Sequence, residues 1–367
     1  MRVGVVGAGL IAQVAHLPHL RELPSRLRVV ALAEPGATAR QAVAQRYGIP
    51  RAVADHRELL DDVDALVVCS PNGTHADVVL DALEAGVHVL VEKPLCLTLA
   101  DADRIVAARD RTGLVVQVGY MKRYDPAYEA LLDDLPADGG AAHAPWHVAT
   151  TTYDPGLAPW FAPPEAPAPG NGPDDLPAAA AHELADRTAE QVAEAVGTDA
   201  PDDVAAFADR FLGALVHDVN AVHGVFERLG LDPPDRVTDA FSVDRGRACG
   251  GAIALPGGGR WTMAWLELPG LGDFREEIAL YGADGIRRLE FPAPYLRAPT
   301  TFTRTEGARD GAATRTFRSW REAYVRELVH FHDCITAGVA CRTPPEQART
   351  DIALLADLFR ASLQVPA

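Results

Sequence analysis

The sequence of 367 residues contains no apolar run that approaches the roughly 20 residues needed to cross a bilayer as a helix. It opens directly on an apolar strand pattern, without the basic segment, apolar stretch and cleavage site of a signal peptide, so we expect a cytoplasmic protein. Its five cysteines are scattered, with no CxxC pair and no metal-ligand spacing. We therefore expect reduced thiols, no metal site and no membrane partner.

Positive charge is scarce as well. The formal net charge is −17, which repels polyphosphate over most of the surface and argues against a nucleic-acid partner. Lysine is scarcer still, because only Lys93 and Lys122 among the 34 basic residues are lysines. Arginine keeps its proton near neutral pH, whereas burial and neighbouring charges can tune a lysine for proton transfer. Both lysines are therefore candidate functional groups.

Short apolar runs alternate with amphipathic segments over the first 120 residues. The runs that predict strands are Val3–Val6, Val29–Ala33, Ala65–Cys69, Val87–Val91 and Val115–Val118. The segments that predict helices are Leu10–Leu23, Thr38–Tyr47, Ala76–Ala85 and Ala100–Arg111. The strand runs are almost continuously apolar, as expected when helices cover both faces of a sheet. The alternation predicts a Rossmann-type domain over residues 1–120, with a doubly wound parallel sheet.

The pattern changes after residue 120, and we predict a second domain over residues 121–367. Its predicted helices are Asp125–Leu132, His182–Val196, Asp202–Leu229, Arg321–Ala337 and Pro345–Leu363. Its predicted strands are His147–Tyr153, Arg236–Val243, Ala248–Leu255, Arg260–Leu268, Arg275–Tyr281 and Gly285–Phe291. Glycine-rich turns between the later strands favour hairpins, so this α+β domain should be built on an open, mostly antiparallel sheet. Segment 155–177, rich in Pro, Gly and Ala, predicts an irregular surface loop or lid, and simple disorder is the open alternative.

The first binding motif is the segment Gly7–Ala12, which reads G-x-G-x-x-A between the first strand and the first helix. In such a motif the first glycine permits a tight turn, the second lets the backbone approach a pyrophosphate, and the alanine lets helix and strand pack closely. The diphosphate of a dinucleotide would lie at the helix N-terminus, which favours anions. We therefore expect cofactor contacts from Gly7, Gly9, Leu10 and Ile11.

An acidic residue ends the second predicted strand. Glu34 can accept both ribose hydroxyls of an adenosine and would repel a 2′-phosphate, so NAD is favoured over NADP. A solvated acid at a strand end is the alternative. Arg40 lies close enough in sequence to keep NADP open as the less favoured cofactor.

The third predicted parallel strand ends in Ser70, Pro71 and Asn72, and His75 opens the helix that follows. Ligands bind at the carboxyl ends of strands in sheets of this kind, so these residues are candidates to line the cofactor groove. His75 fits a structural or capping role better, and we keep it among the cofactor candidates.

Lys93 follows the fourth predicted strand, again at a carboxyl end, in Val91-Glu92-Lys93-Pro94. The proline biases Lys93 away from helical geometry and so predicts a fixed turn that presents Glu92 and Lys93 to the cofactor. Hydride transfer between an alcohol and a nicotinamide ring needs a group that takes or delivers the hydroxyl proton. Burial and the positive nicotinamide ring would both lower the pKa of a lysine toward the working range. Lys122 also follows a predicted strand, but Arg123 beside it is an equal candidate.

Together these segments resemble the Gfo/Idh/MocA family of oxidoreductases. The matching segments are Gly7–Ala12, Ser70–His75, Ala82–Leu95 and Gly119–Pro126, and Glu277–Gly285 looks like the family's sheet-turn segment. The resemblance implies a lysine that acts at the nicotinamide, which would be Lys93, and a Lys–Pro bond that is often cis. It also implies that the open sheet serves to form a homodimer or homotetramer.

In that family a helix of the second domain commonly supplies an Asp and, four residues on, a His beside the substrate. Here His217 takes the histidine place, but the Asp place is Gly213. On a helix, His217 and Asn220 share a face and could meet one substrate, whereas Asp218 points about 100° away from His217 and would support from the side. A core or surface histidine is the alternative for His217.

Four further residues are candidates for substrate contacts. Arg123 and Tyr124 could close a cleft between the domains, and a salt-bridged domain junction is the alternative. Tyr153 and Trp160 flank the proline-rich loop and could contact the substrate or the nicotinamide, or merely pack.

The sequence thus predicts an NAD(P)-dependent oxidoreductase that moves a hydride to or from a sugar, sugar derivative or cyclitol. Lys93 would be the general acid or base and His217 its partner. One alternative is a redox-neutral enzyme that retains its NAD, such as an epimerase or a glycoside-cleaving enzyme. Another is a non-catalytic regulator that senses NAD, because one fold hosts many functions.

Overall fold

The computed structural model describes residues 1–137, 139–156, 176, 178–293, 298–309 and 311–364. Trp160 and most of the predicted 155–177 loop lie outside these residues. The chain divides into two compact units. Unit 1 comprises Met1–Tyr120, Ala162–Ala195 and Tyr324–Arg349, and unit 2 comprises Met121–Phe161, Val196–Ala323 and Thr350–Ala367. The first segment of unit 1 therefore ends at residue 120, and two later segments of the chain group with it.

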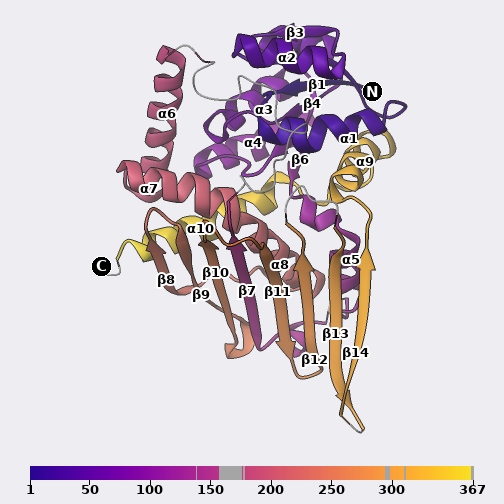
Figure 1. The fold of residues 1–367 in the computed structure, drawn as a ribbon, viewed down its shortest axis with the longest axis vertical. Coiled ribbons are helices and arrows are strands. Elements are labelled where there is room, and N and C mark those ends of the chain that lie inside the picture. Colours follow the sequence, from indigo (N-terminus) through magenta and orange to yellow (C-terminus); the bar gives the residue numbers. More distant parts are fainter. Residues whose placement is uncertain (138, 157–175, 177, 294–297, 310, 365–367) are drawn as a thin grey trace. The chain divides into compact units, whose positions relative to one another are not determined.

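Unit 1 is built on a sheet that lies among helices in Figure 1; this sheet has six strands, and every pairing in it is parallel. The strands are β1 (Arg2–Val6), β2 (Arg28–Ala33), β3 (Arg51–Val53), β4 (Ala65–Val68), β5 (His88–Glu92) and β6 (Val116–Gly119). Their order, β3-β2-β1-β4-β5-β6, confirms the predicted doubly wound sheet. Strand β3 was not predicted, because it is three residues long and none of them is buried.

Helices cover both faces of this sheet, as the nearly continuous apolar strands require. A π-helical stretch, Ala12–His16, leads into α1 (Leu17–Glu22), and α2 (Ala37–Tyr47), α3 (His75–Glu84) and α4 (Leu99–Thr112) follow. The later segments supply α6 (Ala178–Val196) and α9 (Ala323–Ala337). Short 3₁₀ turns are His56–Asp62 and Asn72–Thr74. Leu328 and Phe331 of α9 belong to the same buried core as Val5, Val67 and Leu90 of the sheet.

Unit 2 is built on an eight-stranded sheet ordered β14-β13-β12-β11-β7-β10-β9-β8. The strands are β7 (His147–Asp154), β8 (Val237–Val243), β9 (Ala248–Ala254), β10 (Arg260–Glu267), β11 (Arg275–Gly282), β12 (Gly285–Phe291), β13 (Thr300–Ala308) and β14 (Gly311–Ser319). Only the β7–β10 pairing is parallel, which confirms a mostly antiparallel sheet. Strands β13 and β14 were not predicted. Strand β14 is exposed along nearly its whole length and offers no apolar face, and the buried side chains of β13 are mostly polar (Thr300 and Arg304 beside Phe302).

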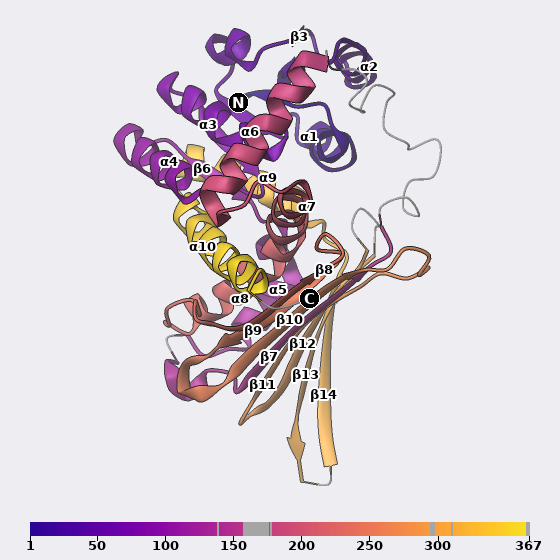
Figure 2. The ribbon, with the colours of Figure 1, turned by 90° about the vertical axis from the view of Figure 1, so that its left-hand side faces the viewer.

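The helices of unit 2 gather on one face of its sheet (Figure 2). They are α5 (Pro126–Asp133), α7 (Pro201–Ala205), a π-helical stretch Ala206–Leu215, α8 (Val216–Arg228) and α10 (Pro345–Ser362), which begins in unit 1. Short 3₁₀ turns are Met121–Tyr124, Ala141–His143 and Pro256–Gly258. The ring of Phe359 in α10 lies 5.3 Å from that of Phe207 and 5.0 Å from that of Phe211. Every residue from Asp218 to Phe226 is buried, so this stretch of α8 has no exposed side.

The five cysteines are free thiols, and four of them are buried. Within the described ranges, no helix combines the length and the apolar character needed to cross a membrane. The same ranges hold no cluster of three or more His, Cys, Asp or Glu side chains that could bind a metal ion.

Candidate functional site

The turn after β1 has the two properties that a dinucleotide motif needs. Gly7 has a φ of 92°, and a Cβ there would lie 2.5 Å from the carbonyl oxygen of Cys69, so only glycine fits. A Cβ on Gly9 would meet no atom within 4 Å, so the backbone there borders open space that a ligand could approach. Ala12 is fully buried, which lets the helix pack closely on the sheet.

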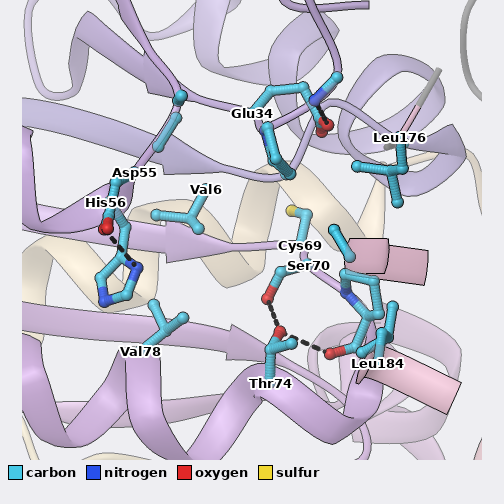
Figure 3. Close-up of a pocket in the computed structure, with 18 of the residues that line it drawn as sticks. Val6, Glu34, Asp55, His56, Cys69, Ser70, Thr74, Val78, Leu176 and Leu184 are labelled. Carbon is cyan, nitrogen blue, oxygen red and sulfur yellow. Dashed lines mark hydrogen bonds and ion pairs between the residues drawn. The ribbon is translucent and has the colours of Figure 1, made fainter. Parts of the chain in front are cut away.

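A pocket of about 670 Å³ opens beside this turn (Figure 3). This volume lies in the range of small-molecule and cofactor sites. The predicted cofactor residues that line it are Gly7, Gly9, Glu34, Ser70 and Pro71. The predicted cofactor residues that do not line it are Leu10, Ile11, Asn72, His75, Glu92, Lys93 and Arg123. The pocket is therefore lined by the two motif glycines, by Glu34 after β2 and by residues that follow β4.

Glu34 is held rigidly at the pocket. Its two carboxylate oxygens accept hydrogen bonds of 2.8 Å from the backbone N–H groups of Ala8 and Gly36. Arg40 is the residue that left NADP open as a cofactor when the sequence was considered alone. In the structure its guanidinium group donates hydrogen bonds to the carbonyl oxygens of Glu34 and Pro35. The acid thus stays fixed where a ribose would meet the turn.

The two arginines that line the pocket are already paired with carboxylates. Arg57 Nε donates to Asp81 at 2.8 Å, and Arg187 Nη2 lies 2.7 Å from Asp77 Oδ2. Both pairs are partly exposed, so their main effect is on local charge rather than on stability. The lining as a whole offers no excess of positive charge to a phosphate.

The loop after β4 is tied together by its own side chains. Thr74 Oγ1 donates to Ser70 Oγ and to the carbonyl oxygen of Pro71, both at 2.7 Å. The two ring nitrogens of His75 lie 2.7 Å and 2.8 Å from the carbonyl oxygens of Pro94 and Ser70. Burial lowers the pKa of His75. The ring therefore links this loop to the turn that carries Lys93.

Lys93 follows β5 at the same edge of the sheet, and its peptide bond to Pro94 is cis, as the resemblance implied. Glu92 accepts a hydrogen bond from the Lys93 backbone N–H and pairs with His16 Nε2 at 2.6 Å. Burial lowers the pKa of Lys93, and the negative charge of Glu92 partly opposes this shift. Burial by itself would raise the pKa of Glu92, but the hydrogen bond and charge of His16 and the charge of Lys93 bring it below its ordinary value.

A second buried acid lies close to this edge. Glu327 on α9 is fully buried, and neither of its carboxylate oxygens has a hydrogen-bond partner within the described residues. Burial, and then the charge of Glu92, raise the pKa of Glu327 well above its ordinary value. An acid in these surroundings favours its neutral form. The edge of the sheet therefore holds Lys93 next to Glu92, whose lowered pKa favours the ionised form, and Glu92 in turn lies near Glu327, whose raised pKa favours the protonated form.

The residues predicted to bind substrate lie in unit 2, and several are engaged by other side chains. Asn220 is buried and donates from Nδ2 to Asp351 Oδ2 at 2.8 Å. Asp351 Oδ1 lies 2.7 Å from His223 Nδ1, so this carboxylate joins α8 to α10. Asn220 is thus committed to the interior of unit 2. His217 stands in the first turn of α8 and is only partly buried.

Asp218 lies in a buried charge cluster with the second lysine. Lys122 forms an ion pair with Glu276 and lies 3.7 Å from Asp218 Oδ1 and 4.8 Å from the centre of the Phe291 ring. Thr152 Oγ1 donates to Asp218 Oδ2 at 3.4 Å. Burial raises the pKa of Asp218, and the charge of Lys122 opposes the shift. We name Lys122, Asp218 and Glu276 the buried charge cluster.

Arg123, Tyr124 and Tyr153 also belong to unit 2. The buried Arg123 binds Glu227 at 2.9 Å and lies 5.8 Å from the centre of the Tyr128 ring. Both partners of this ion pair belong to unit 2, so the pair is not the salt-bridged domain junction named as the alternative in the sequence. Tyr124 is 1% exposed, and Tyr153 is partly buried on β7, beside β10 and β11.

Sequence reasoning missed four polar residues that the structure makes prominent: His16, Glu276, Glu327 and Asp351. Glu327 had a visible signal, because it falls at helical spacing with Tyr324, Leu328 and Phe331 on the apolar face of its helix. The other three owe their importance to partners that are far away in sequence. No local spacing indicates such pairs.

Comparison with known proteins gives a consistent picture of the N-terminal part. Residues 1–120 match the family model described as oxidoreductase family, NAD-binding Rossmann fold, the GFO_IDH_MocA family. An inositol 2-dehydrogenase from Salmonella typhimurium is 34% identical over 170 residues, which are 45% of this chain and 50% of the relative. The chain therefore spans about half the length of the curated relatives that it matches.

Solved structures resemble the whole chain in fold. A UDP-N-acetylglucosamine 3-dehydrogenase from Acidithiobacillus ferrooxidans has a TM-score of 0.70 at 19% identity, and the match covers 99% of both chains. A 3-ketoreductase from Actinomadura kijaniata, solved with TDP-benzene and NADP, has a TM-score of 0.69 at 21% identity, covering 99% of this chain and 97% of the other. At these identities the likeness establishes the fold alone.

Proposed function

We propose that this chain, whose first 120 residues belong to the Gfo/Idh/MocA oxidoreductase family, is an NAD(P)-dependent oxidoreductase acting on CH–OH groups of a sugar, sugar derivative or cyclitol. The observation that carries the proposal is the pocket beside the Gly7 turn, with Glu34 fixed in its lining and Lys93 following β5 of the same sheet. Inositol and sugar dehydrogenases among the relatives support the polyol-like substrate class.

The dinucleotide would be held by Gly7, Gly9, Glu34, Ser70 and Pro71, and its nicotinamide ring would accept or supply the hydride. Gly9 would let the backbone approach the diphosphate, and Glu34 would accept hydrogen bonds from the ribose hydroxyls.

Lys93 takes the hydroxyl proton during oxidation of the alcohol and returns it during reduction of the ketone. Burial supports this role, because it lowers the pKa of the ammonium group toward neutrality. Glu92 fixes the turn through the Lys93 backbone N–H, and its charge keeps the pKa of Lys93 from falling further.

NAD is the proposed cofactor in preference to NADP. A 2′-phosphate would meet the Glu34 carboxylate, while Arg40 is bound to backbone carbonyls and Arg57 and Arg187 are paired with aspartates. These charges make a second phosphate group unfavourable in the pocket.

The substrate contacts in unit 2 stay predictions. Among them His217 is the leading candidate, because it is only partly buried, whereas Asn220, Asp218 and Arg123 are buried. Assembly as a homo-oligomer through the open sheet and a cytoplasmic location also stay predictions.

The test is a screen of sugars, sugar derivatives and cyclitols with NAD and NADP, following the absorbance of the reduced nicotinamide in both directions. We expect turnover with at least one polyol-like compound and a lower KM for NAD than for NADP. If no carbohydrate-like compound reacts in either direction, the substrate class is wrong. Cofactor that stays bound through purification without net NADH formation would instead favour a redox-neutral enzyme, and binding without any turnover would favour a sensor.

A further inference from the structure

Helix α6 contributes to the dinucleotide pocket although it lies far along the chain from the family-matching segment. The pocket lining includes Leu176 just before α6, and Ala180, Leu184 and Arg187 on it. Leu176 and Leu184 face the same cavity as Glu34 and Ser70 (Figure 3). All of these residues belong to unit 1. The pocket is therefore bounded by the strand ends of the sheet and also by a helix that arrives later in the sequence.

One face of α6 makes these contacts. Ala180, Leu184, Arg187 and Gln191 follow one another at steps of four, three and four residues, which places them along a single helical stripe. The first part of the stripe lines the pocket. Arg187 also pairs with Asp77 on α3 at 2.7 Å, and Gln191 Nε2 donates to the carbonyl oxygen of Gly73 at 3.2 Å.

The end of the stripe fits closely against the loop after β4. A Cβ on Gly73 would lie 2.8 Å from Thr188 Oγ1 and 3.0 Å from Gln191 Oε1. Thr188 Oγ1 is itself held by donating to the carbonyl oxygen of Leu184 at 2.8 Å. Glycine at position 73 therefore allows α6 to approach the loop, and the ion pair and the hydrogen bond hold it there.

We propose that α6 forms the outer wall of the adenosine half of the cofactor site and that Leu184 packs against the adenosine. This inference rests on the proposed function, since it takes the pocket to bind a nicotinamide dinucleotide. The chemistry of the lining fits an adenosine: Glu34 offers acceptors to the ribose hydroxyls, and Leu184, Pro35 and Val78 offer apolar surface to a purine. Residues outside the family-matching segment would then determine how tightly this chain holds its cofactor.

The experiment measures binding of NAD and of ADP-ribose, which carries the adenosine and diphosphate without the nicotinamide, to the full chain by calorimetry. Leu184→Ala removes apolar contact surface from a partly buried side chain, so we expect both ligands to bind about tenfold more weakly. Leu184→Trp places a bulkier, aromatic side chain into the pocket and should weaken the binding of both ligands further. Glu183→Ala, at the exposed neighbouring position on the same helix, is the matched control and should bind both ligands as the unaltered chain does.

Thermal unfolding of all three variants checks that each is folded. If the unaltered chain binds NAD, and both Leu184 variants bind NAD and ADP-ribose within about twofold of it, the wall assignment is overturned while the proposed function stands. If the unaltered chain binds neither NAD nor NADP, the proposed function fails, and this inference fails with it.

Discussion

Lys93 in unit 1 and Lys122 in unit 2 are the chain's two lysines, and their surroundings differ in kind. Lys93 lies at the carboxyl end of a parallel strand, next to one carboxylate that is itself bound to His16. Lys122 lies in the buried charge cluster between two carboxylates. The first lysine has surroundings that lower its pKa, and the second neutralises charges that would otherwise be buried alone. The two lysines of this lysine-poor sequence therefore lie in two different electrostatic surroundings.

The largest expected effect separates the two lysines by activity. Lys93→Met should lower kcat about 10²- to 10⁴-fold, because no other group is proposed to transfer the hydroxyl proton. Lys93→Arg should lose similar activity, since arginine keeps its proton near neutral pH. Steady-state kinetics on the best substrate of the screen measures this. Wild-type turnover in either variant would remove Lys93 from the proposed mechanism. The proposed functional difference between Lys93 and Lys122 would then be lost.

The next effect separates them by stability. Lys122→Met leaves Asp218 and Glu276 buried without their shared cation, so the free energy of unfolding should fall by about 3–5 kcal/mol. Denaturant titration measures this change. Arg26→Ala breaks the exposed pair with Asp333 and should cost less than about 1 kcal/mol. If Lys122→Met and Arg26→Ala lowered the free energy of unfolding equally, water would have to reach the carboxylates of the buried charge cluster. The low exposure of these side chains argues against that result.

A smaller effect tests the other end of the unit 1 site. Glu34→Gln should raise the KM for NAD about tenfold, because a neutral amide accepts weaker hydrogen bonds from the ribose hydroxyls than a carboxylate does. The preference for NAD over NADP should narrow as well, since the repulsion of a 2′-phosphate is lost. Kinetics with both cofactors checks this, and an unchanged NAD-to-NADP ratio would refute the role given to Glu34.

The smallest expected effect is a change in how steeply the free energy of unfolding varies with pH. The pKa of Glu327 is raised in the folded state above its ordinary value of 4.5, so its contribution to stability is fully present below pH 4.5 and is lost as pH rises through the folded pKa. One such group changes the free energy of unfolding by at most about 1.4 kcal/mol per pH unit. Glu327→Gln keeps a neutral side chain at all pH values and should flatten this decline.

Chemical denaturation across pH 4.5 to neutral measures the slope for Glu327→Gln. Glu84→Gln, a change at an exposed position, serves as the control. A Glu327→Gln slope identical to that of the unaltered chain would show that Glu327 is ionised when folded. The edge of the sheet that carries Lys93 would then hold two negative charges, Glu92 and Glu327. It would resemble the buried charge cluster, in which one lysine lies near two carboxylates.

The two units also differ in how well local patterns predict them. In unit 1 the motif residues Gly7, Gly9 and Glu34 follow strands whose apolar runs are unmistakable, and they line one pocket. In unit 2 the helical spacing of His217 and Asn220 predicted a shared substrate-facing side. Asn220 donates a hydrogen bond to Asp351, because the stretch Asp218–Phe226 of α8 is buried and Asn220 meets a protein partner there. Helical spacing places both residues on one side of α8, but it does not identify Asp351 as the partner of Asn220.

The sequence by itself determined the doubly wound sheet, the mostly antiparallel second sheet and the residues of the Gly7 turn. These features depend on short-range periodicity and on the carboxyl ends of neighbouring parallel strands meeting at one edge. Only the tertiary structure decided that α6 lines the pocket, that Glu327 lies near Glu92 and that Lys122 is enclosed by carboxylates. Those contacts join residues more than 90 positions apart, and the packing that brings such groups together leaves no trace in local spacing.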